Sequence, residues 1–279
     1  MIKDISNAYG ISGFEDLAVD TIKQYLEGLG KLEEDSLRNL YIYGRRNTGR
    51  KMKVMLDAHS DEVGFMVHSI NPKGLLQIIP IGGWINSNIP SHKVRVRTTD
   101  GKYIFGLTTS KPPHFMSESE RKLPISIENI LVDVGATSYN EAINKFKLGI
   151  GEPVVPDVEF KYIDDSDLMI GKAFDCRLGC AAIVSTLHQL STDDLDVDVV
   201  GTFSSQEEVG TRGAVIAANK VKPDLAIVFE GCPADDTFLE DHEIQTAIKR
   251  GPMLRHIDAR MITNRSEERR VGKECRSRW

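Results

Sequence analysis

The feature that most constrains this fold is an apolar stretch that ends in acidic residues. In residues 199–213, VVGTFSSQEEVGTRG, an apolar run reaches the adjacent pair Glu207 and Glu208, and a helix-forming segment follows Gly210. In open parallel sheets, ligands bind beyond the carboxyl ends of the strands. Two neighbouring carboxylates repel each other, and a bound cation is the simplest reason to tolerate them. A lone glutamate pair more often belongs to a solvated loop, so the rest of the chain decides between the two readings.

Three other apolar runs end in the same way. KVMLDA is followed by His59 with Asp61 two residues later, LMIGKAF leads to Asp175, and DLAIVF leads to Glu230. A carboxylate near a histidine can orient the imidazole for metal binding. Each residue alone is more often structural, but four such ends in a strand–helix alternation suggest one shared site. An imidazole with several carboxylates suits zinc, cobalt or manganese rather than calcium.

The alternation of strands and helices predicts an α/β fold. We expect a mostly parallel-sheet catalytic domain made of residues 1–67 and 162–264. Between these parts, residues 68–161 contain short β-rich runs such as KVRVRTT and KYIFGLTTS, separated by glycine and proline. This texture predicts an inserted small β-barrel-like domain, which we expect to serve in dimerisation or assembly.

A helix start is predicted near the N-terminus. Ser12 and Glu15, in the sequence SGFE, have the spacing of a capping box. In that motif the serine and glutamate side chains each accept a hydrogen bond from an otherwise unpaired backbone N–H. We therefore expect a helix from this motif through Tyr25.

The composition excludes several function classes. The net charge is -6, and no stripe rich in lysine and arginine occurs before the extreme C-terminus, so we expect no nucleic-acid partner. The N-terminus lacks an apolar signal core, and no run approaches the ~20 apolar residues of a membrane span. We therefore expect a cytoplasmic protein with no membrane partner. The four cysteines form no paired zinc pattern and are expected to be reduced.

The last fifteen residues differ from the rest of the chain. Residues 265–279, RSEERRVGKECRSRW, contain six basic and three acidic residues without apolar periodicity. They resemble the in-frame translation of a common sequencing-adapter oligonucleotide. We therefore expect a non-native tail, with the natural protein continuing past Asn264.

Four motifs in this order resemble one protein family. AHSDEVGF, GKAFDCRLG, SSQEEVGTRGA and VFEGCPADD are similar to the motifs of the tetrahedral (TET) aminopeptidases, which are di-metal exopeptidases that include glutamyl and deblocking aminopeptidases. The resemblance covers about residues 5–264. It implies short peptides as substrates, and self-association into a dodecamer in which the inserted domain takes part.

The resemblance also implies a role for each site residue. Two divalent metal ions are expected, zinc or cobalt in the first place and manganese otherwise, and the implied ligands are His59, Asp175, Glu208 and Glu230. Asp175 would bridge the two ions. Glu207 would be the general base, and Asp61 would orient His59. The position after Asp175 is commonly aspartate or asparagine in the family and is Cys176 here, which is not expected to be a ligand.

One ligand of the family has no counterpart in this sequence. The second metal ion of the family also takes a histidine from a strand near the C-terminus, and neither His242 nor His256 matches that position. We expect that this chain holds one ion well and the other poorly, and that it is inactive if the missing part is required.

The expected reaction is the release of N-terminal residues from short peptides. A hydroxide bridging the two ions would attack the peptide carbonyl after Glu207 takes its proton. Two alternatives stay open at this point: a di-metal deacylase or amidase acting on small N-acyl substrates, and a catalytically dead assembly protein. Glycoside hydrolysis would require an acid and a base flanking a sugar rather than a metal cluster.

Overall fold

The structure is a computed structural model that describes residues 1–255, 257 and 262. The predicted non-native tail at residues 265–279 lies outside the described residues. The chain divides into two units, residues 1–231 and the residues from Cys232 onward. The first unit contains every helix and strand named below and all six residues predicted for the site.

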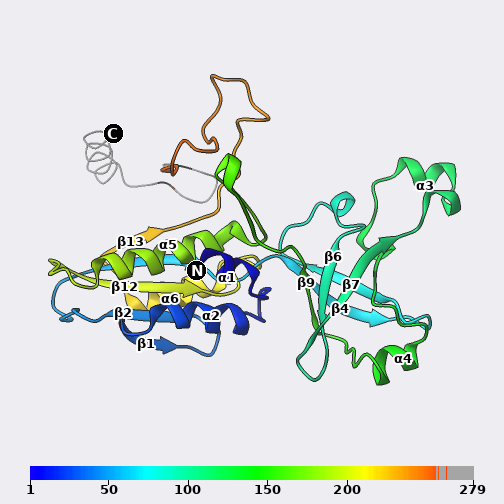
Figure 1. Ribbon diagram of the computed structural model, residues 1–279, viewed down its shortest axis with the longest axis horizontal. Coiled ribbons are helices and arrows are strands. Elements are labelled where there is room, and N and C mark those ends of the chain that lie inside the picture. The colour runs from blue at the N-terminus through cyan, green and yellow to red at the C-terminus, as the bar shows by residue number, and fades with distance from the viewer. Residues whose placement is uncertain (256, 258–261, 263–279) are drawn as a thin grey trace. The chain divides into compact units, whose positions relative to one another are not determined.

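A five-stranded mixed sheet forms the centre of the first unit, in the order β1-β2-β12-β3-β13 (Figure 1). Its strands are β1 (Gly30–Glu34), β2 (Leu40–Gly44), β3 (Met52–His59), β12 (Val197–Ser204) and β13 (Leu225–Val228). β12 and β13 flank β3 and both run parallel to it. The β1–β2 and β2–β12 pairings are antiparallel. The three parallel strands therefore share one carboxyl edge.

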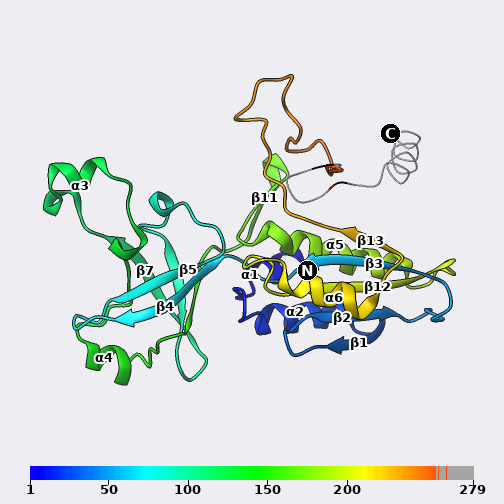
Figure 2. The ribbon, with the colours of Figure 1, turned by 180° about the vertical axis from the view of Figure 1, so that it is seen from behind.

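Helices cover both faces of this sheet, as the view from behind in Figure 2 also shows. They are α1 (Ile2–Asn7), α2 (Asp16–Leu26), α5 (Phe174–Leu190) and α6 (Arg212–Val221). The first three share one apolar core with the sheet, and α6 packs on the opposite face. Side chains alternate between the faces of a strand, so Val54 enters the first core and its neighbour Met55 enters the second. Burial on both faces explains why these strands read as apolar runs.

A closed six-stranded barrel follows β3 in the chain, in the order β4-β5-β8-β7-β6-β9. Its strands are β4 (Gly64–Ile70), β5 (Leu76–Ile81), β6 (Lys93–Arg97), β7 (Tyr103–Ser110), β8 (Ile130–Asp133) and β9 (Pro153–Pro156). Its interior is a second apolar core, in which Phe65 stacks on Trp84 with ring centroids 4.6 Å apart. The predicted fold class, an α/β protein with a barrel-like insertion, is confirmed.

Shorter elements complete the first unit. They are the helices α3 (Glu118–Lys122) and α4 (Tyr139–Asn144), the hairpin of β10 (Lys161–Ile163) and β11 (Leu168–Ile170), and the 3-10 turns Asn86–Asn88, Pro113–Phe115, Ile127–Asn129 and Asp164–Ser166. The barrel strands run from Gly64 to Pro156, while the domain division at residues 68 and 161 stays a prediction.

The predicted capping box at Ser12 and Glu15 is wrong. α2 begins at Asp16 with Glu15 as its N-cap residue, and no side chain caps it. The Ser12 hydroxyl instead donates to Asp61, and the Glu15 carboxylate accepts from the Gly13 and Gln206 N–H groups. Buried partners from distant parts of the chain have replaced the local hydrogen bonds that the spacing predicts.

The second unit is built from turns in the part of the chain that the structure describes. The Asp235 carboxylate accepts hydrogen bonds from the N–H groups of Gln245 (3.2 Å) and Thr246 (3.0 Å), which closes a loop. An isolated bridge joins Ile257 and Ile262. The helices and strands of the described residues therefore belong to the first unit.

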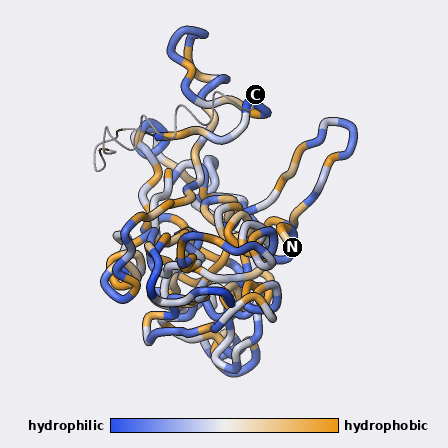
Figure 3. The backbone as a smooth tube through the Cα atoms, turned by 90° about the vertical axis from the view of Figure 1, so that its left-hand side faces the viewer, coloured by the Kyte–Doolittle hydropathy of each residue, from blue (hydrophilic) through white to orange (hydrophobic). Residues whose placement is uncertain are grey.

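Hydrophobic and hydrophilic residues alternate over short distances along the chain (Figure 3). Across residues 1–255, no helix combines the length and the apolar character that crossing a bilayer requires. The longest described helix, α5, has 17 residues.

A substitution at Phe203 tests how much the core between the sheet and helices α1, α2 and α5 contributes to stability. The Phe203 side chain on β12 is fully buried between the sheet and the helices. We expect Phe203→Ala to lower the free energy of unfolding by about 3–5 kcal/mol, because it removes buried apolar area and leaves a cavity. Chemical denaturation of the metal-free protein measures this. The control Phe238→Ala, at a side chain that is 85% exposed, should stay within about 0.5 kcal/mol of the parent. Equal effects of the two changes would contradict this packing.

Candidate metal centre

The parallel strands bring the predicted site residues to one edge of the sheet. β3 ends at His59, and the register pairs His59 with Ser204, the last residue of β12. Glu207 and Glu208 follow three and four residues after that pair, and Glu230 follows β13 on the other side of β3. Asp175 comes to the same place from the start of α5.

The His59 imidazole lies at the centre of a carboxylate cluster. Its Nε2 atom is 2.9 Å from Asp175 Oδ1, 3.4 Å from Glu230 Oε1 and 3.9 Å from Glu207 Oε2. His59 is only 3% exposed, whereas the Asp175 and Glu230 side chains are more than half exposed. The cluster therefore has a buried nitrogen on one side and solvent-accessible oxygens on the other.

Two overlapping groups of side chains in the described part of the chain could hold a cation. One consists of His59, Asp175, Cys176 and Glu230, and the other of His59, Glu207 and Glu208. Within each group the possible ligand atoms lie within 4.8 Å of one another. Glu208 is therefore grouped with Glu207 and His59 rather than with Asp175, the bridging residue that the resemblance implies.

Asp175 is positioned by an irregular start of α5. The backbone of Asp175 and Cys176 is not helical, and the peptide bond between them is cis. The segment after β13 comes very close to this point: a Cβ on Gly231 would lie 2.6 Å from the Asp175 Cβ. Only glycine permits such an approach, which lets Glu230 and Asp175 share the space in front of His59.

Cys176 points away from solvent. Its Sγ donates a 3.0 Å hydrogen bond to the Phe229 carbonyl, and burial raises the pKa of the thiol to about 12. Since the thiolate is the form that binds a metal ion, Cys176 would have to lose both its proton and this hydrogen bond to become a ligand. The imidazole and carboxylates are therefore the donors that fit a divalent cation here.

The second nitrogen of His59 is held by the segment that follows β3. His59 Nδ1 lies 3.2 Å from the Asp61 backbone carbonyl and 3.4 Å from the Asp61 carboxylate oxygen Oδ1. A proton on Nδ1 shared with these oxygens leaves Nε2 free to bind a cation. The carbonyl is the closer partner, so the orientation of His59 does not depend on the Asp61 side chain alone.

The Asp61 side chain has a second function that the sequence analysis missed. Its carboxylate is fully buried and accepts hydrogen bonds from the N–H groups of Glu207 (3.0 Å) and Glu208 (3.1 Å). It also accepts one from the Ser12 hydroxyl (2.6 Å). Every residue except proline carries a backbone N–H donor, so no sequence motif could have indicated these hydrogen bonds. Asp61 thus fixes the loop that carries both glutamates.

The site concentrates negative charge, and the pKa values of its groups respond to it. Burial raises the pKa of Glu208 to about 7 and raises that of Glu207. Burial opposes protonation of His59, but hydrogen bonds to Asp175, Asp61 and Glu230 outweigh it and raise the pKa of the imidazole. In the metal-free protein a proton on His59 is thus the counter-charge of the cluster. A divalent cation can take the place of that proton, so the residues present fit such an ion.

The barrel contributes to one side of the site. A Cβ on Gly82, which directly follows β5, would lie 3.2 Å from Glu208 Oε2. No sequence motif indicated Gly82, whose φ of +80° is a conformation that favours glycine. Of the two histidines discussed for the second metal ion, His242 belongs to the second unit and His256 is not described.

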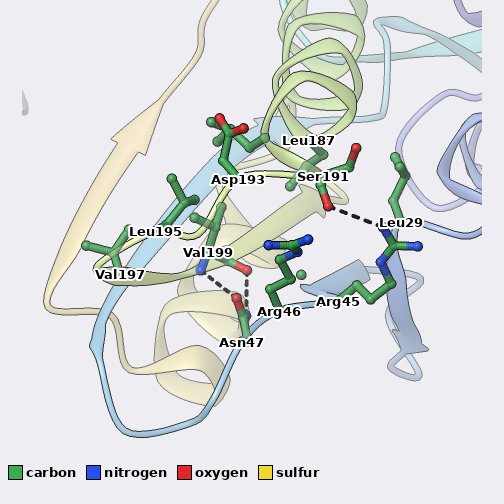
Figure 4. A pocket seen from close by; sticks show the side chains of 12 residues that line it. Leu29, Arg45, Arg46, Asn47, Leu187, Ser191, Asp193, Leu195, Val197 and Val199 are labelled. Carbon is green, nitrogen blue, oxygen red and sulfur yellow. Dashed lines mark hydrogen bonds between the residues drawn. The ribbon is translucent and has the colours of Figure 1, made fainter.

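A small cavity elsewhere in the first unit is separate from this site. Figure 4 shows it, about 30 Å³ in volume, near the start of β12, where Asn47 exchanges hydrogen bonds with the Val199 backbone and Arg45 donates to the Ser191 carbonyl. The carboxylate cluster lies beyond the opposite end of the same strand. The cavity is thus not part of the candidate metal centre.

The chain is similar in sequence to known proteins. The sequence profile described as M42 glutamyl aminopeptidase matches residues 39–276. The protein called glutamyl aminopeptidase in Lactococcus lactis subsp. cremoris (strain MG1363) is 32% identical over 244 residues, which are 86% of this chain and 68% of that protein.

Solved structures share the fold. The TET aminopeptidase from the marine sediment archaeon Thaumarchaeota archaeon SCGC AB-539-E09 superposes with a TM-score of 0.93 and 33% identity, covering 99% of this chain and 77% of that one. The TET1 peptidase of Pyrococcus horikoshii, whose description says that it can assemble into a tetrahedron or a large octahedral shell, has a TM-score of 0.84 and 25% identity over 98% of this chain and 79% of that one. Because the profile matches most of the chain, this protein belongs to the M42 glutamyl aminopeptidase family, a family of metallopeptidases that use divalent metal ions.

Proposed function

We propose that this protein is a metal-dependent aminopeptidase that removes N-terminal residues from short peptides. The observation that carries the proposal is the buried His59 imidazole facing carboxylates from α5, the β12 loop and the β13 loop. The relatives whose names describe aminopeptidases support the same reaction. Peptides are the substrate class that follows from this activity.

Two divalent cations, zinc or cobalt in preference to manganese, would be held by four side chains: His59, Asp175, Glu208 and Glu230. His59 and Glu230 would bind one ion, Glu208 the other, and Asp175 would lie between them. When bound, the ions polarise the scissile carbonyl and make the attacking water more acidic. The donor set of one imidazole and several carboxylates suits these metals.

Glu207 is the proposed general base. Its carboxylate lies 3.9 Å from His59 Nε2 and is adjacent in sequence to Glu208, so it faces the same space as the metal ligands. Burial raises its pKa, which strengthens it as a proton acceptor. Glu207 would take the proton of the attacking water and pass it to the leaving amine as a general acid. Asp61 would orient His59, and its carboxylate would hold Glu207 by accepting from the Glu207 backbone N–H.

We further propose that the chain self-associates, as the TET1 peptidase of Pyrococcus horikoshii does. The inserted domain, residues 68–161, is the proposed assembly surface. Phe115 in this domain is 74% exposed and is available for such a contact. Trp84, in the same domain, is partly buried against the barrel core, where it stacks on Phe65 and donates to the Gly64 carbonyl.

Replacement of the proposed base separates catalysis from metal binding. In the full-length enzyme, we expect Glu207→Gln to keep the metal content of the parent and to lower turnover by about 10²–10⁴-fold, because the amide cannot accept the proton of water. Metal analysis and the release of N-terminal residues from peptides with a free amine measure the two effects. Glu27→Gln, on an exposed residue after α2, is the control and should change neither. Unchanged turnover in Glu207→Gln would refute the role of Glu207.

Metal affinity should depend on pH. The pKa of His59 is raised in the metal-free protein, and that of Glu208 is raised to about 7, so a cation must displace protons from these groups. Affinity is therefore expected to rise with pH, by about tenfold per pH unit for each proton displaced. Calorimetric titration with Co²⁺ at about pH 6 and about pH 8, in buffers of different ionisation enthalpy, measures the affinity and the proton release. An affinity that is equal at both pH values would contradict the proposed ligands.

A further inference from the structure

The turn formed by residues 12–15, SGFE, has two buried polar side chains that do not cap a helix. Ser12 is 6% exposed and Glu15 is fully buried. Burying a hydroxyl and a carboxylate costs free energy unless they make hydrogen bonds. Both side chains turn away from α2 and toward the loops of the candidate metal centre. We call residues 12–15 the N-terminal turn.

Ser12 reaches the metal centre through Asp61. Its hydroxyl donates to Asp61 Oδ2 at 2.6 Å, and the same oxygen accepts from the Glu208 N–H at 3.1 Å. The other oxygen, Oδ1, accepts from the Glu207 N–H and lies 3.4 Å from His59 Nδ1. Ser12 thus donates to a carboxylate that contacts three residues of the site.

Glu15 reaches the same loop one residue earlier. Its Oε1 atom accepts from the Gln206 N–H at 3.1 Å and from the Gly13 N–H at 2.8 Å. Gln206 has a φ of +53°, which is unusual for a residue with a side chain and requires support from its surroundings. The bond from Glu15 is one of the contacts that hold Gln206, directly before the two glutamates; Arg212 makes the others.

The residues just before the N-terminal turn are anchored to the segment after β3 and to α5. The Gly10 carbonyl accepts from the Glu62 N–H at 2.9 Å and from Arg177 at 3.2 Å, and Ile11 pairs with Glu62 in a parallel bridge. Arg177 also donates to the Ile5 and Ala8 carbonyls. The chain that leads into the turn is therefore fixed to the elements that carry His59 and Asp175.

We propose that Ser12 and Glu15 are positioning residues of the metal centre. Ser12 acts through the Asp61 carboxylate and Glu15 through the Gln206 N–H, and together they hold the Glu207–Glu208 loop against His59. This inference deepens the proposed function and rests on it for the metal ions, but the hydrogen bonds that carry it exist without them.

Three variants and one matched control test the proposal. Ser12→Ala removes the hydrogen bond to Asp61, and Glu15→Ala removes both hydrogen bonds of the Glu15 side chain. Glu15→Gln keeps a side chain of the same length with one oxygen that can accept. The control is Ser6→Ala, which removes an equally buried serine hydroxyl of the N-terminal segment whose partner is the Lys172 carbonyl rather than the site.

Amide hydrogen exchange in the metal-free protein is the first measurement. We expect Ser12→Ala to speed exchange at Glu207 and Glu208, and Glu15→Ala to speed it at Gln206, by more than Ser6→Ala does. Glu15→Gln should exchange like the parent. If Ser12→Ala and Glu15→Ala match Ser6→Ala at all three amides, the N-terminal turn does not position the loop and the proposal falls.

Co²⁺ binding is the second measurement. We expect Ser12→Ala and Glu15→Ala to weaken Co²⁺ binding about tenfold and to change the visible absorption spectrum of the bound ion, as loss of supporting contacts around a metal site does. Ser6→Ala and Glu15→Gln should leave both unchanged. An unchanged affinity and spectrum in Ser12→Ala and Glu15→Ala would overturn the positioning role. Failure of the parent itself to bind Co²⁺ would refute the proposed function, while the exchange measurement would still decide this inference.

Discussion

The buried carboxylate of Asp61 is the contact on which the candidate metal centre depends. It accepts hydrogen bonds from the N–H groups of Glu207 and Glu208 and from Ser12, and it lies beside the Nδ1 atom of His59. These hydrogen bonds offset the free-energy cost of burying the carboxylate. One side chain therefore joins the end of β3, the loop after β12 and the N-terminal turn.

The sheet makes this meeting possible. Because β12 and β13 both run parallel to β3, their carboxyl ends deliver the β12 loop and Glu230 to either side of His59. Helix α5 brings Asp175 to the same point, and Gly231 lets the chain pass it at close range. The arrangement concentrates carboxylates whose repulsion a bound cation would relieve. The two packed faces of the sheet thus support a site in which several carboxylates lie close together.

Strand ends were the informative signal in the sequence. The residues after the apolar runs, such as His59 and Glu230, could be expected to meet because the ends of parallel strands share an edge. The β-rich texture of the insertion likewise predicted a barrel, and the structure has a closed one. Ser12 and Glu15 were misassigned because a capping box and a pair of distant contacts have the same spacing in sequence. The bonds of Asp61 to backbone N–H groups could not be predicted, since every residue except proline carries such a donor.

Anomalous diffraction from crystals grown with Co²⁺ tests the central claim most directly. The account predicts a strong anomalous peak about 2.0–2.2 Å from His59 Nε2, with oxygens of Asp175 and Glu230 at similar distances. A second peak beside Glu208 would show the other ion of the pair. Anomalous peaks only at other places in the molecule, with His59 Nε2 still bonded to Asp175, would contradict a metal centre at this edge of the sheet.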